Sequence, residues 1–500
     1  MNQNLFDMLG GLRTGGEAVC FVLPDGRTIS YRELIARSSQ FANALVAAGV
    51  SPADRVAVQI EKSWESIALY LATIRAGAVF LPLNTAYTPA EVSYFLSDAE
   101  PRIFVCDPAR ESSLAESSHD ARIMTMSAAG AGSLPAMADT ASSEFATVER
   151  GGDDLAAILY TSGTTGRSKG AMLTHANLAS NAQTLVTAWQ FTKADRLIHA
   201  LPIFHTHGLF VACNVTLACG SSMIFLPGFS VDEIFRFLPE ATCLMGVPTF
   251  YTRLLQDPRL NRETTAGTRL FVSGSAPLLA ETHDEWRART GHAILERYGM
   301  SETNMNTSNP YEGERIAGTV GLPLPGVTIR ITDLATGEVK GVGEVGAIEV
   351  AGPNVFSGYW RMPEKTASEF RGEFFNTGDV GVIDQRGYVS IVGRTKDLII
   401  SGGYNIYPKE VETEIDALDG VMESAVIGLP HPDFGEAVTA VVVLKPGCAL
   451  TEEFIKQELS QRLARFKVPK RISFVEELPR NVMGKVQKNV LRENATQIGT

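Results

Sequence analysis

A loop rich in glycine and hydroxyl residues carries the strongest chemical signal in this sequence. It reads Tyr160-Thr-Ser-Gly-Thr-Thr-Gly-Arg-Ser-Lys-Gly170, follows an apolar run and precedes a helical pattern that begins at Thr174. Consecutive small residues let backbone N–H groups and hydroxyls converge on phosphate oxygens, and Lys169 adds a positive charge. The two central glycines stand too close together for the Walker pattern. The sequence therefore predicts a phosphate-binding loop of another type, because a merely flexible turn does not need so many hydroxyl groups.

Five further segments concentrate polar and glycine residues in short stretches of chain. They are Leu201-Pro-Ile-Phe-His-Thr-His-Gly208, Tyr298-Gly-Met-Ser-Glu-Thr303, Thr377-Gly-Asp379, Gly393-Arg-Thr-Lys-Asp397 with Gly402-Gly403, and Pro479-Arg-Asn-Val-Met-Gly-Lys485.

Alternating strands and helices must position these segments. Short apolar runs bounded by Gly or Pro alternate with helical patterns, as at residues 155–160 and 270–272, and this alternation is typical of α/β proteins. A chain of 500 residues exceeds the ~250–300 at which a single core stops growing, so at least two domains are expected. After Gly341 short strands and tight turns predominate, which predicts a second, smaller domain with its boundary near Arg394.

Composition and charge argue against several classes of protein. With 45% apolar and 20% charged residues, the chain matches ordinary globular proteins. The formal charge of −12 argues against a general nucleic-acid binder, although residues 462–492 hold nine Lys or Arg against two acids. The six cysteines lack metal-ligand spacing. Neither a signal peptide nor a long apolar run occurs, so we expect a cytoplasmic protein without nucleic-acid or membrane partners.

The quoted segments are weak signals one by one, but their order and spacing resemble the adenylate-forming superfamily of acyl-CoA synthetases, peptide-synthetase adenylation domains and luciferases. The resemblance covers nearly the whole chain. It implies an α/β fold with a large N-terminal domain of αβαβα-layered sheets (residues 1–394), a hinge (395–397) and a small, mobile α+β C-terminal domain (398–500). It also implies that ATP and Mg²⁺ are used to activate a carboxylic acid as an acyl-adenylate, which then passes its acyl group to coenzyme A.

The resemblance assigns the following residues to ATP binding: Thr161, Ser162, Gly163, Thr164, Thr165, Gly166, Lys169, Ser275, Ala276, Pro277, Tyr298, Gly299, Met300, Ser301, Asp379 and Arg394. Asp379 and Arg394 suit ribose hydroxyls, and their alternative is a surface salt bridge of little energetic value. Tyr298 is expected near the adenine, whereas a lone Tyr more often belongs to a core. Glu302 and Thr165 are expected to ligate Mg²⁺, which takes few carboxylates and bridges phosphate oxygens. For Glu302 the alternative is a helix cap.

The catalytic residues that the resemblance implies are Lys485, His205 and Glu302. Lys485 would reach the α-phosphate and the carboxylate, and acetylation, which cancels its charge, could act as an off switch. The alternative is that Lys485 is one more cation of a basic tail. His205 would lie beside the reacting carboxylate, although an isolated histidine is more often structural. Lys396 matches the hinge, and Gly402 and Gly403 match the loop that lines the pantetheine tunnel.

Four segments narrow down the acid: Phe204-His-Thr-His-Gly-Leu-Phe210, Gly246-Val-Pro-Thr-Phe-Tyr-Thr-Arg253, Ser273-Gly-Ser-Ala-Pro277 and Thr303-Asn-Met-Asn-Thr307. They resemble segments of malonyl-CoA synthetases. A dicarboxylate in a dry pocket needs its second charge paired, and Arg253 offers a two-donor fork for it. The alternative is that Arg253 pairs with Asp257 one helical turn later. The residues expected around the acid are Arg253, Ser275, His205, Thr206, His207 and Met305.

Malonate is therefore the expected acid, with methylmalonate as a further substrate and another small carboxylic acid as the alternative. A peptide-synthetase adenylation domain is disfavoured because the chain ends 15 residues after Lys485 (500 − 485), too soon for a carrier domain. A luciferase-like oxygenase shares the motifs. A non-catalytic nucleotide sensor is disfavoured because Lys485, Glu302 and the phosphate loop are all intact.

Overall fold

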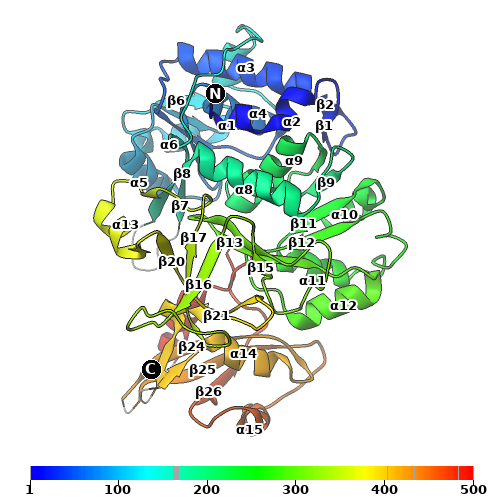
Figure 1. The fold of residues 1–500 in the computed structure, drawn as a ribbon, viewed down its shortest axis with the longest axis vertical. Helices are drawn as coiled ribbons and strands as arrows, with labels where there is room; N and C mark the ends of the chain where they lie inside the picture. Colours follow the sequence, from blue (N-terminus) through cyan, green and yellow to red (C-terminus); the bar gives the residue numbers. More distant parts are fainter. Residues whose placement is uncertain (1, 162–167, 402–403, 433, 482–483, 499–500) are drawn as a thin grey trace. The chain divides into compact units, whose positions relative to one another are not determined.

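The chain divides into two compact units. The computed structural model describes residues 2–161, 168–401, 404–432, 434–481 and 484–498 (Figure 1). One unit comprises Met1–Thr328 and Ala351–Phe375, and the other comprises Ile329–Val350 and Asn376–Thr500. The expected α/β class, with a large N-terminal and a small C-terminal part, is confirmed. A hinge is defined by rotation of one domain against another, which a division into compact units does not test. The hinge at residues 395–397 therefore stays a prediction.

A seven-stranded sheet in the larger unit carries the flanks of the phosphate loop. Its order is β18-β8-β7-β4-β3-β5-β6. The strands from β3 to β7 pair in parallel, whereas β8 pairs antiparallel with both β7 and β18. Their bounds are β3 (Arg55–Gln59), β4 (Val79–Pro82), β5 (Ile103–Cys106), β6 (Arg122–Thr125), β7 (Leu155–Thr161), β8 (Lys169–Thr174) and β18 (Gly358–Tyr359).

A nine-stranded sheet in the same unit has the order β15-β14-β13-β12-β11-β9-β10-β1-β2. Its central strands β9 to β13 pair in parallel, and β14 pairs antiparallel with β13. The carboxyl ends of β9, β11, β12 and β13 therefore meet at one edge, which is where open α/β sheets bind ligands. The bounds are β1 (Val19–Val22), β2 (Thr28–Ser30), β9 (Arg196–His199), β10 (Ser222–Phe225), β11 (Cys243–Gly246), β12 (Leu270–Ser273), β13 (Leu295–Met300), β14 (Asn304–Ser308) and β15 (Leu322–Pro323).

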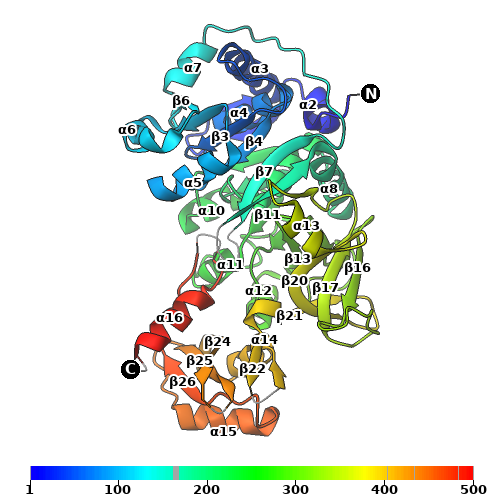
Figure 2. The same cartoon turned by 90° about the vertical axis from the view of Figure 1, so that its left-hand side faces the viewer.

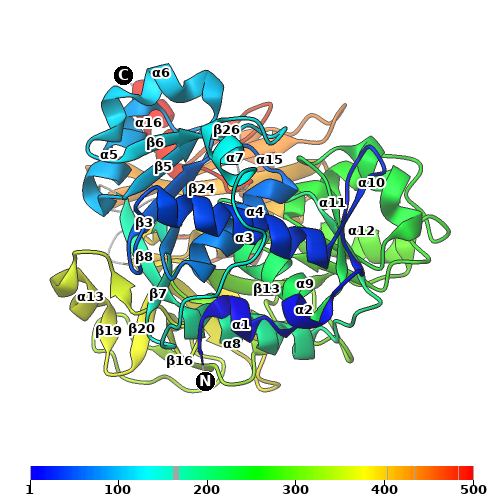
Figure 3. The ribbon, with the colours of Figure 1, turned by 90° about the horizontal axis from the view of Figure 1, so that it is seen from above.

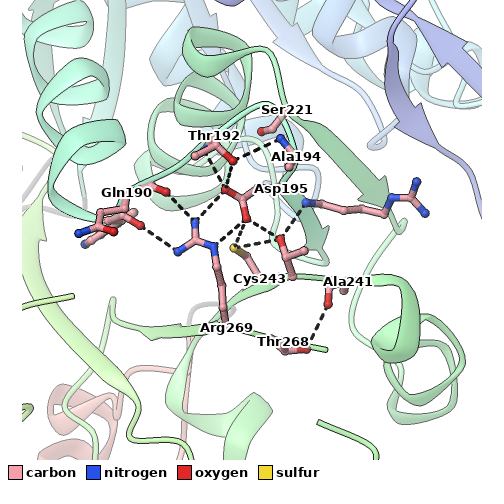
Figure 4. A network of polar contacts seen from close by, with 12 residues as sticks. Gln190, Thr192, Ala194, Asp195, Ser221, Ala241, Cys243, Thr268 and Arg269 are labelled. Atoms are coloured by element: carbon pink, nitrogen blue, oxygen red, sulfur yellow. Dashed lines mark hydrogen bonds and ion pairs between the residues drawn. The ribbon is translucent and has the colours of Figure 1, made fainter. Parts of the chain in front are cut away.

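The opposite edge of this sheet is fixed by a polar network (Figure 4). Asp195 precedes β9, and both of its carboxylate oxygens accept hydrogen bonds of 2.8 Å from Arg269, which precedes β12. Thr242, which precedes β11, donates to the same carboxylate at 2.7 Å. A bidentate Arg–carboxylate pair adds geometric specificity to its energy. The network holds three strands in register at their amino ends, so their carboxyl ends are presented in a fixed arrangement.

Helices cover both sheets. α4 is buried along nearly its whole length, and α3 packs beside it (Figures 2 and 3). Capping boxes at Ser30, Ser63 and Thr174 begin α3, α4 and α8, so the local sequence specifies where each helix starts. The helices of this unit include α1 (Leu5–Met8), α2 (Gly10–Thr14), α3 (Tyr31–Ala47), α4 (Trp64–Arg75), α5 (Pro89–Ala99), α8 (His175–Ala188), α9 (Asn214–Cys219), α10 (Val231–Phe237), α11 (Pro248–Leu255), α12 (Ala280–Thr290) and α13 (Pro363–Glu369).

The smaller unit contains a sheet of order β23-β22-β25-β24, with β26 beside β25. Side chains of β24 alternate between two apolar clusters, one with Val426 beside α14 and α15, the other with Ala425 and Ile427 beside α16. The hairpin of β20 and β21 also lies here. The bounds are β16 (Thr328–Thr332), β17 (Gly346–Ala351), β20 (Phe374–Ile383), β21 (Val389–Arg394), β22 (Ile399–Ser401), β23 (Tyr404–Ile406), α14 (Pro408–Asp416), β24 (Val421–His431), β25 (Gly435–Leu444), α15 (Glu452–Arg462), β26 (Arg471–Phe474) and α16 (Lys488–Ile498).

In the described parts of both units, every helix is too short or too polar to cross a membrane.

Candidate active site

The phosphate loop joins two antiparallel strands. Thr161 ends β7, Lys169 begins β8, and the two residues are paired across the hairpin. The predicted helix does start after Thr174, but the segment between the loop and that helix is a strand. A helix N-terminus therefore does not directly follow the loop. The predicted phosphate ligands Ser162, Gly163, Thr164, Thr165 and Gly166 lie outside the described residues.

Lys169 is connected to Glu302 through Tyr359 of β18. The Lys169 ammonium lies over the Tyr359 ring, 4.4 Å from its centroid. The Tyr359 hydroxyl donates a 3.0 Å hydrogen bond to a carboxylate oxygen of Glu302. Burial and the adjacent Glu302 charge raise the pKa of Tyr359, so this hydroxyl remains a donor at neutral pH. The structure thus brings together two residues that the sequence predicted for ATP and metal binding, through a tyrosine that sequence reasoning missed.

Glu302 lies in the turn between β13 and β14 and not at a helix terminus, so the helix-cap alternative is wrong. Its residue is 5% exposed, and its backbone carbonyl accepts a hydrogen bond from Phe356 N. Gly299 is required nearby, since a Cβ there would stand 1.7 Å from the carbonyl oxygen of Asn304. Tyr298 is buried, and Met300 and Ser301 are half-buried on the same hairpin.

The carboxylate of Glu302 fits a magnesium ion. Mg²⁺ keeps several of its waters and is usually held by one or two carboxylates together with substrate phosphates. Among the residues that the structure describes, no group of three or more His, Cys, Asp or Glu side chains forms a protein-only metal site. The buried Glu302 carboxylate, connected through Tyr359 to Lys169, is the kind of donor that a phosphate-bound Mg²⁺ needs.

His205 and His207 stand at the start of a π-helical turn, η3 (His207–Cys213), a geometry frequent at functional sites. His207 is buried, and its Nδ1 lies 3.2 Å from the hydroxyl of Ser275. Burial, followed by the positive charge of Arg297, lowers the pKa of His207 well below its usual value. The imidazole is therefore neutral and supplies one donor and one acceptor. His205 is half-buried, with its ring 4.8 Å from that of Phe204.

Arg297 of β13 is the principal residue that sequence reasoning missed. It is 3% exposed, and within the described residues its Nε and Nη2 meet no hydrogen-bond partner. Burial lowers its pKa to about 9, which still leaves the guanidinium charged at neutral pH. Gly274 makes room for it, since a Cβ at that position would lie 2.4 Å from the Arg297 Cζ. Its place directly before the Tyr298 segment was the available signal.

Arg253, the predicted partner of a second carboxylate, is exposed on α11. Its guanidinium carbon lies 5.9 Å from the centroid of the Phe229 ring. Asp257, its alternative partner, instead forms an ion pair of 2.7 Å with Arg259. An exposed arginine pairs weakly with a carboxylate, so Arg297 is better placed than Arg253 to answer a buried charge.

Several predicted pocket residues lie close to these groups. Ser275 follows β12 with a left-handed φ of 73°, and Ala276 and Pro277 continue its loop. Thr206 is buried, and its hydroxyl has no hydrogen-bond partner in the described part of the chain. Met305 of β14 is buried, with its Cε 2.6 Å from where a Cβ of Gly299 would stand.

The predicted ribose-binding pair and the predicted hinge lysine lie in the smaller unit. Asp379 and Arg394 face each other across β20 and β21 and form an ion pair of 2.8 Å. Asp379 is buried, so this pair differs from the weak, fully exposed salt bridge that was the alternative. Lys396 is exposed in a short 3₁₀ turn directly after β21. The predicted CoA-loop residues Gly402 and Gly403 lie outside the described residues.

Lys485 stands on a tight loop of the smaller unit with its side chain exposed. Other cations of the basic segment form ion pairs within this unit: Arg480 with Glu423, Lys488 with Glu412, and Arg492 with Asp397. The positive charge of residues 462–492 is therefore partly neutralised.

Two family models match the chain. The description "AMP-binding enzyme" applies to residues 12–360, and "AMP-binding enzyme C-terminal domain" applies to residues 410–485. Together they include all the segments that carry the candidate site except those between the two matched regions.

Relatives and solved structures extend this match over the full length. The ATP-bound crystal structure of MatB from Rhodopseudomonas palustris superimposes with a TM-score of 0.98 at 61% identity, covering 100% of both chains. A malonate–CoA ligase from Arabidopsis thaliana is 35% identical over 88% of this chain and 78% of its own length. A feruloyl-CoA synthase from an Amycolatopsis species is 36% identical over 93% of this chain and 94% of its own.

Proposed function

Because this chain belongs to the family of AMP-binding enzymes, we propose that it is an AMP-forming acid–CoA ligase acting on malonate. It converts malonate, ATP and CoA into malonyl-CoA, AMP and pyrophosphate through a malonyl-adenylate. Support comes from the malonate–CoA ligase of Arabidopsis and from MatB, the latter 61% identical over the full length.

The observation that carries the malonate assignment is the buried guanidinium of Arg297. Glu296 and Tyr251 favour the charged form of Arg297, but within the described residues its Nε and Nη2 meet no hydrogen-bond partner. Burying a charge with donors unpaired is costly, and malonate brings a second carboxylate that does not react. Pairing that carboxylate with Arg297 would satisfy both charges, with Ser275 and His207 adding hydroxyl and imidazole contacts. Arg253 remains a proposed second cation for the same group. An acid without a distal carboxylate would leave Nε and Nη2 of Arg297 without an acceptor from the described residues.

The proposed first step forms the adenylate. A carboxylate oxygen of malonate, oriented by His205, attacks the α-phosphorus of ATP, and the bond to pyrophosphate breaks. No protein nucleophile is required. Lys485, Lys169 and the phosphate loop offset the charge that spreads over the transition state. Glu302 and Thr165 would hold Mg²⁺, which would neutralise part of the phosphate charge.

The ATP contacts in this proposal follow the predicted set. Asp379 and Arg394 bind the ribose hydroxyls, and Tyr298 with Gly299, Met300 and Ser301 lies along the adenine and phosphates. Ser275, Ala276 and Pro277 form a second wall beside the nucleotide.

The proposed second step transfers the acyl group. The CoA thiolate attacks the acyl carbonyl, and the carbon–oxygen bond to AMP breaks. We propose that the C-terminal domain rotates at Lys396 between the two steps, which withdraws Lys485 and brings in Gly402 and Gly403 for the pantetheine arm. Acetylation of Lys485 would cancel its charge and so stop the first step. We also propose that the reaction takes place in the cytoplasm.

A pyrophosphate-release screen of malonate, methylmalonate, acetate, benzoate and octanoate, each with ATP and Mg²⁺, tests the proposal. The expected order is malonate first, methylmalonate second and the monocarboxylates far behind. A preference for any monocarboxylate would refute the malonate assignment, and the absence of pyrophosphate release with every acid would favour a nucleotide sensor. CoA-independent product release or light emission would instead favour a stand-alone adenylation enzyme or an oxygenase.

A further inference from the structure

The described residues of the segment Pro479–Lys485 make several hydrogen bonds and an ion pair around the backbone of Lys485. Lys485 is the last residue of a loop whose two ends are joined by an antiparallel bridge between Arg480 and Val486. Gln487 N donates to Pro479 O at 2.8 Å, which closes the base of the loop. Below it, Leu478 and Val486 pack into the apolar cluster of β24, β25 and α16. The two ends of the loop are therefore fixed to each other and to the apolar cluster, and Lys485 lies at the C-terminal end of the loop, directly before Val486.

Asn481 makes two hydrogen bonds with the backbone of Lys485. The Asn481 side-chain oxygen accepts a hydrogen bond of 3.0 Å from Lys485 N, and Asn481 N donates to Lys485 O at 3.0 Å. Gly484 N also donates to Asn481 O at 2.8 Å. Gly484 has a φ of 73°, a left-handed conformation that glycine adopts without strain. These contacts determine the direction in which the Lys485 side chain leaves the loop.

Arg480 connects the loop to the sheet. Its Nη1 donates a 2.6 Å hydrogen bond to the carbonyl oxygen of Gly484, the residue before Lys485. Its Nη2 forms an ion pair with Glu423 of β24. Glu423 lies on a strand paired along its whole length with β25, and only 22% of its side chain is exposed. One guanidinium thus bridges a rigid strand and the carbonyl adjoining the catalytic lysine.

We propose that Glu423 and Arg480 are positioning residues that aim Lys485 during adenylation. This inference rests on the proposed two-step function. A long, exposed lysine has many rotamers, and its effect on a transition state depends on placement within about 1 Å. The Glu423–Arg480–Gly484 chain fixes the backbone from which the lysine extends, while neither residue needs to touch a substrate. Their contribution should therefore be confined to the step that uses Lys485.

The charges around Glu423 are consistent with a held pair. Burial raises the pKa of Glu423, and the adjacent Arg480 offsets only part of that rise. The other charged groups of this region are Glu412, Asp416, Lys409 and Lys488. Lys488 of α16 pairs with Glu412 of α14 at 2.6 Å. It is the matched control, since it is an ion pair of the same kind in the same unit.

The test measures the two half-reactions separately in the variants Arg480→Met and Glu423→Ala. Malonyl-AMP formation, measured by rapid quench, should fall at least about 10-fold, because a displacement of about 1 Å can cost up to about 100-fold. Malonyl-CoA formation from presynthesised malonyl-AMP should stay within about twofold of the parent rate, a change too small to indicate a lost interaction. Arg480→Lys, which keeps one donor and the charge, should recover part of the loss. Lys488→Met should affect both half-reactions by the same factor.

A double variant decides whether Arg480 acts through Lys485. Residues that act as a unit are non-additive, so Arg480→Met in a Lys485→Ala background should cause no further loss of adenylation. An additive loss, or equal losses in both half-reactions of the single variant, would overturn the inference. If the parent adenylates a different acid, the proposed substrate is wrong, but the same comparison with that acid still tests the positioning role.

Discussion

At the scale of single residues, Arg297 joins stability to specificity. Its lowered pKa means that the folded protein disfavours the charged form, so at neutral pH this guanidinium reduces stability. Malonate would relieve that cost by pairing with it. The free protein is therefore less stable because of this buried charge, and we expect a ligand with a distal carboxylate to offset that loss of stability.

Arg297→Met should separate these two effects. We expect kcat/KM for malonate to fall at least about 30-fold, since losing a desolvated charge pair typically costs 2–5 kcal/mol, while activity on butyrate is retained or gained. Without ligand, the variant should melt a few degrees higher than the parent. Malonate should raise the Tm of the parent and not that of the variant. Equal losses on malonate and butyrate would show that Arg297 is structural.

Arg253→Met is the matched comparison, because Arg253 is exposed. The same assay should show a smaller loss of kcat/KM for malonate than Arg297→Met does. A larger loss of kcat/KM than that of Arg297→Met would show that Arg253 is the principal partner of malonate's distal carboxylate.

Thr206 and Met305 are expected to limit the group allowed on C2 of malonate. Both are buried, and one methylene is worth only about 1–3 kcal/mol of discrimination in an apolar pocket, so the limit should be graded. Thr206→Gly combined with Met305→Val should raise kcat/KM for ethylmalonate and propylmalonate relative to malonate. An unchanged ratio of the three values would remove both residues from the pocket wall.

At the scale of elements, the β13–β14 hairpin brings Arg297, Glu302 and Met305 into one site within a short stretch of chain. The sequence predicted Glu302 and Met305, because motifs identify residues by order and type. It did not predict Arg297, since the space for this buried side chain depends on Gly274, which follows strand β12. It also missed Tyr359, which reaches Glu302 from β18, and strand β8, which lies between the loop and the helix that it did predict. Contacts between distant segments are what a single sequence leaves undetermined.

The attachment of α1 to α8 should make stability depend on pH. His175, the first residue of α8, accepts a 3.0 Å hydrogen bond at Nδ1 from Leu5 N. Burial and then the Arg150 charge lower the pKa of His175 to about 4. The unfolded chain therefore binds the proton more readily, and stability present above about pH 6.5 is lost as pH falls towards 4, by up to about 3 kcal/mol.

Melting curves between pH 4 and 7.5 check this expectation. His175→Asn should be less stable than the parent at pH 7.5, where the neutral histidine is in place, and its Tm should fall less steeply as pH is lowered. Parallel curves for the two proteins would assign the acid sensitivity to other groups.

At the scale of the whole molecule, the two half-reactions should depend differently on Lys485. Lys485→Ala ought to lower malonyl-AMP formation by at least about 100-fold, the scale expected for removing one electrostatic stabiliser. Given presynthesised malonyl-AMP and CoA, the same variant should make malonyl-CoA at nearly the parent rate. Rapid-quench measurement of both steps checks this, and equal losses would mean that Lys485 supports the fold or CoA binding.

The central claim is that malonate is activated by attack of its own carboxylate on the α-phosphorus of ATP. In that reaction one carboxylate oxygen stays with the phosphorus when the thiol later breaks the carbon–oxygen bond. The most direct measurement is therefore the mass of the AMP formed from malonate labelled with ¹⁸O in its carboxylates, with CoA present. We predict a single ¹⁸O in each AMP and an equal amount of malonyl-CoA. Unlabelled AMP, or ¹⁸O recovered in inorganic phosphate alongside ADP, would contradict the malonyl-adenylate.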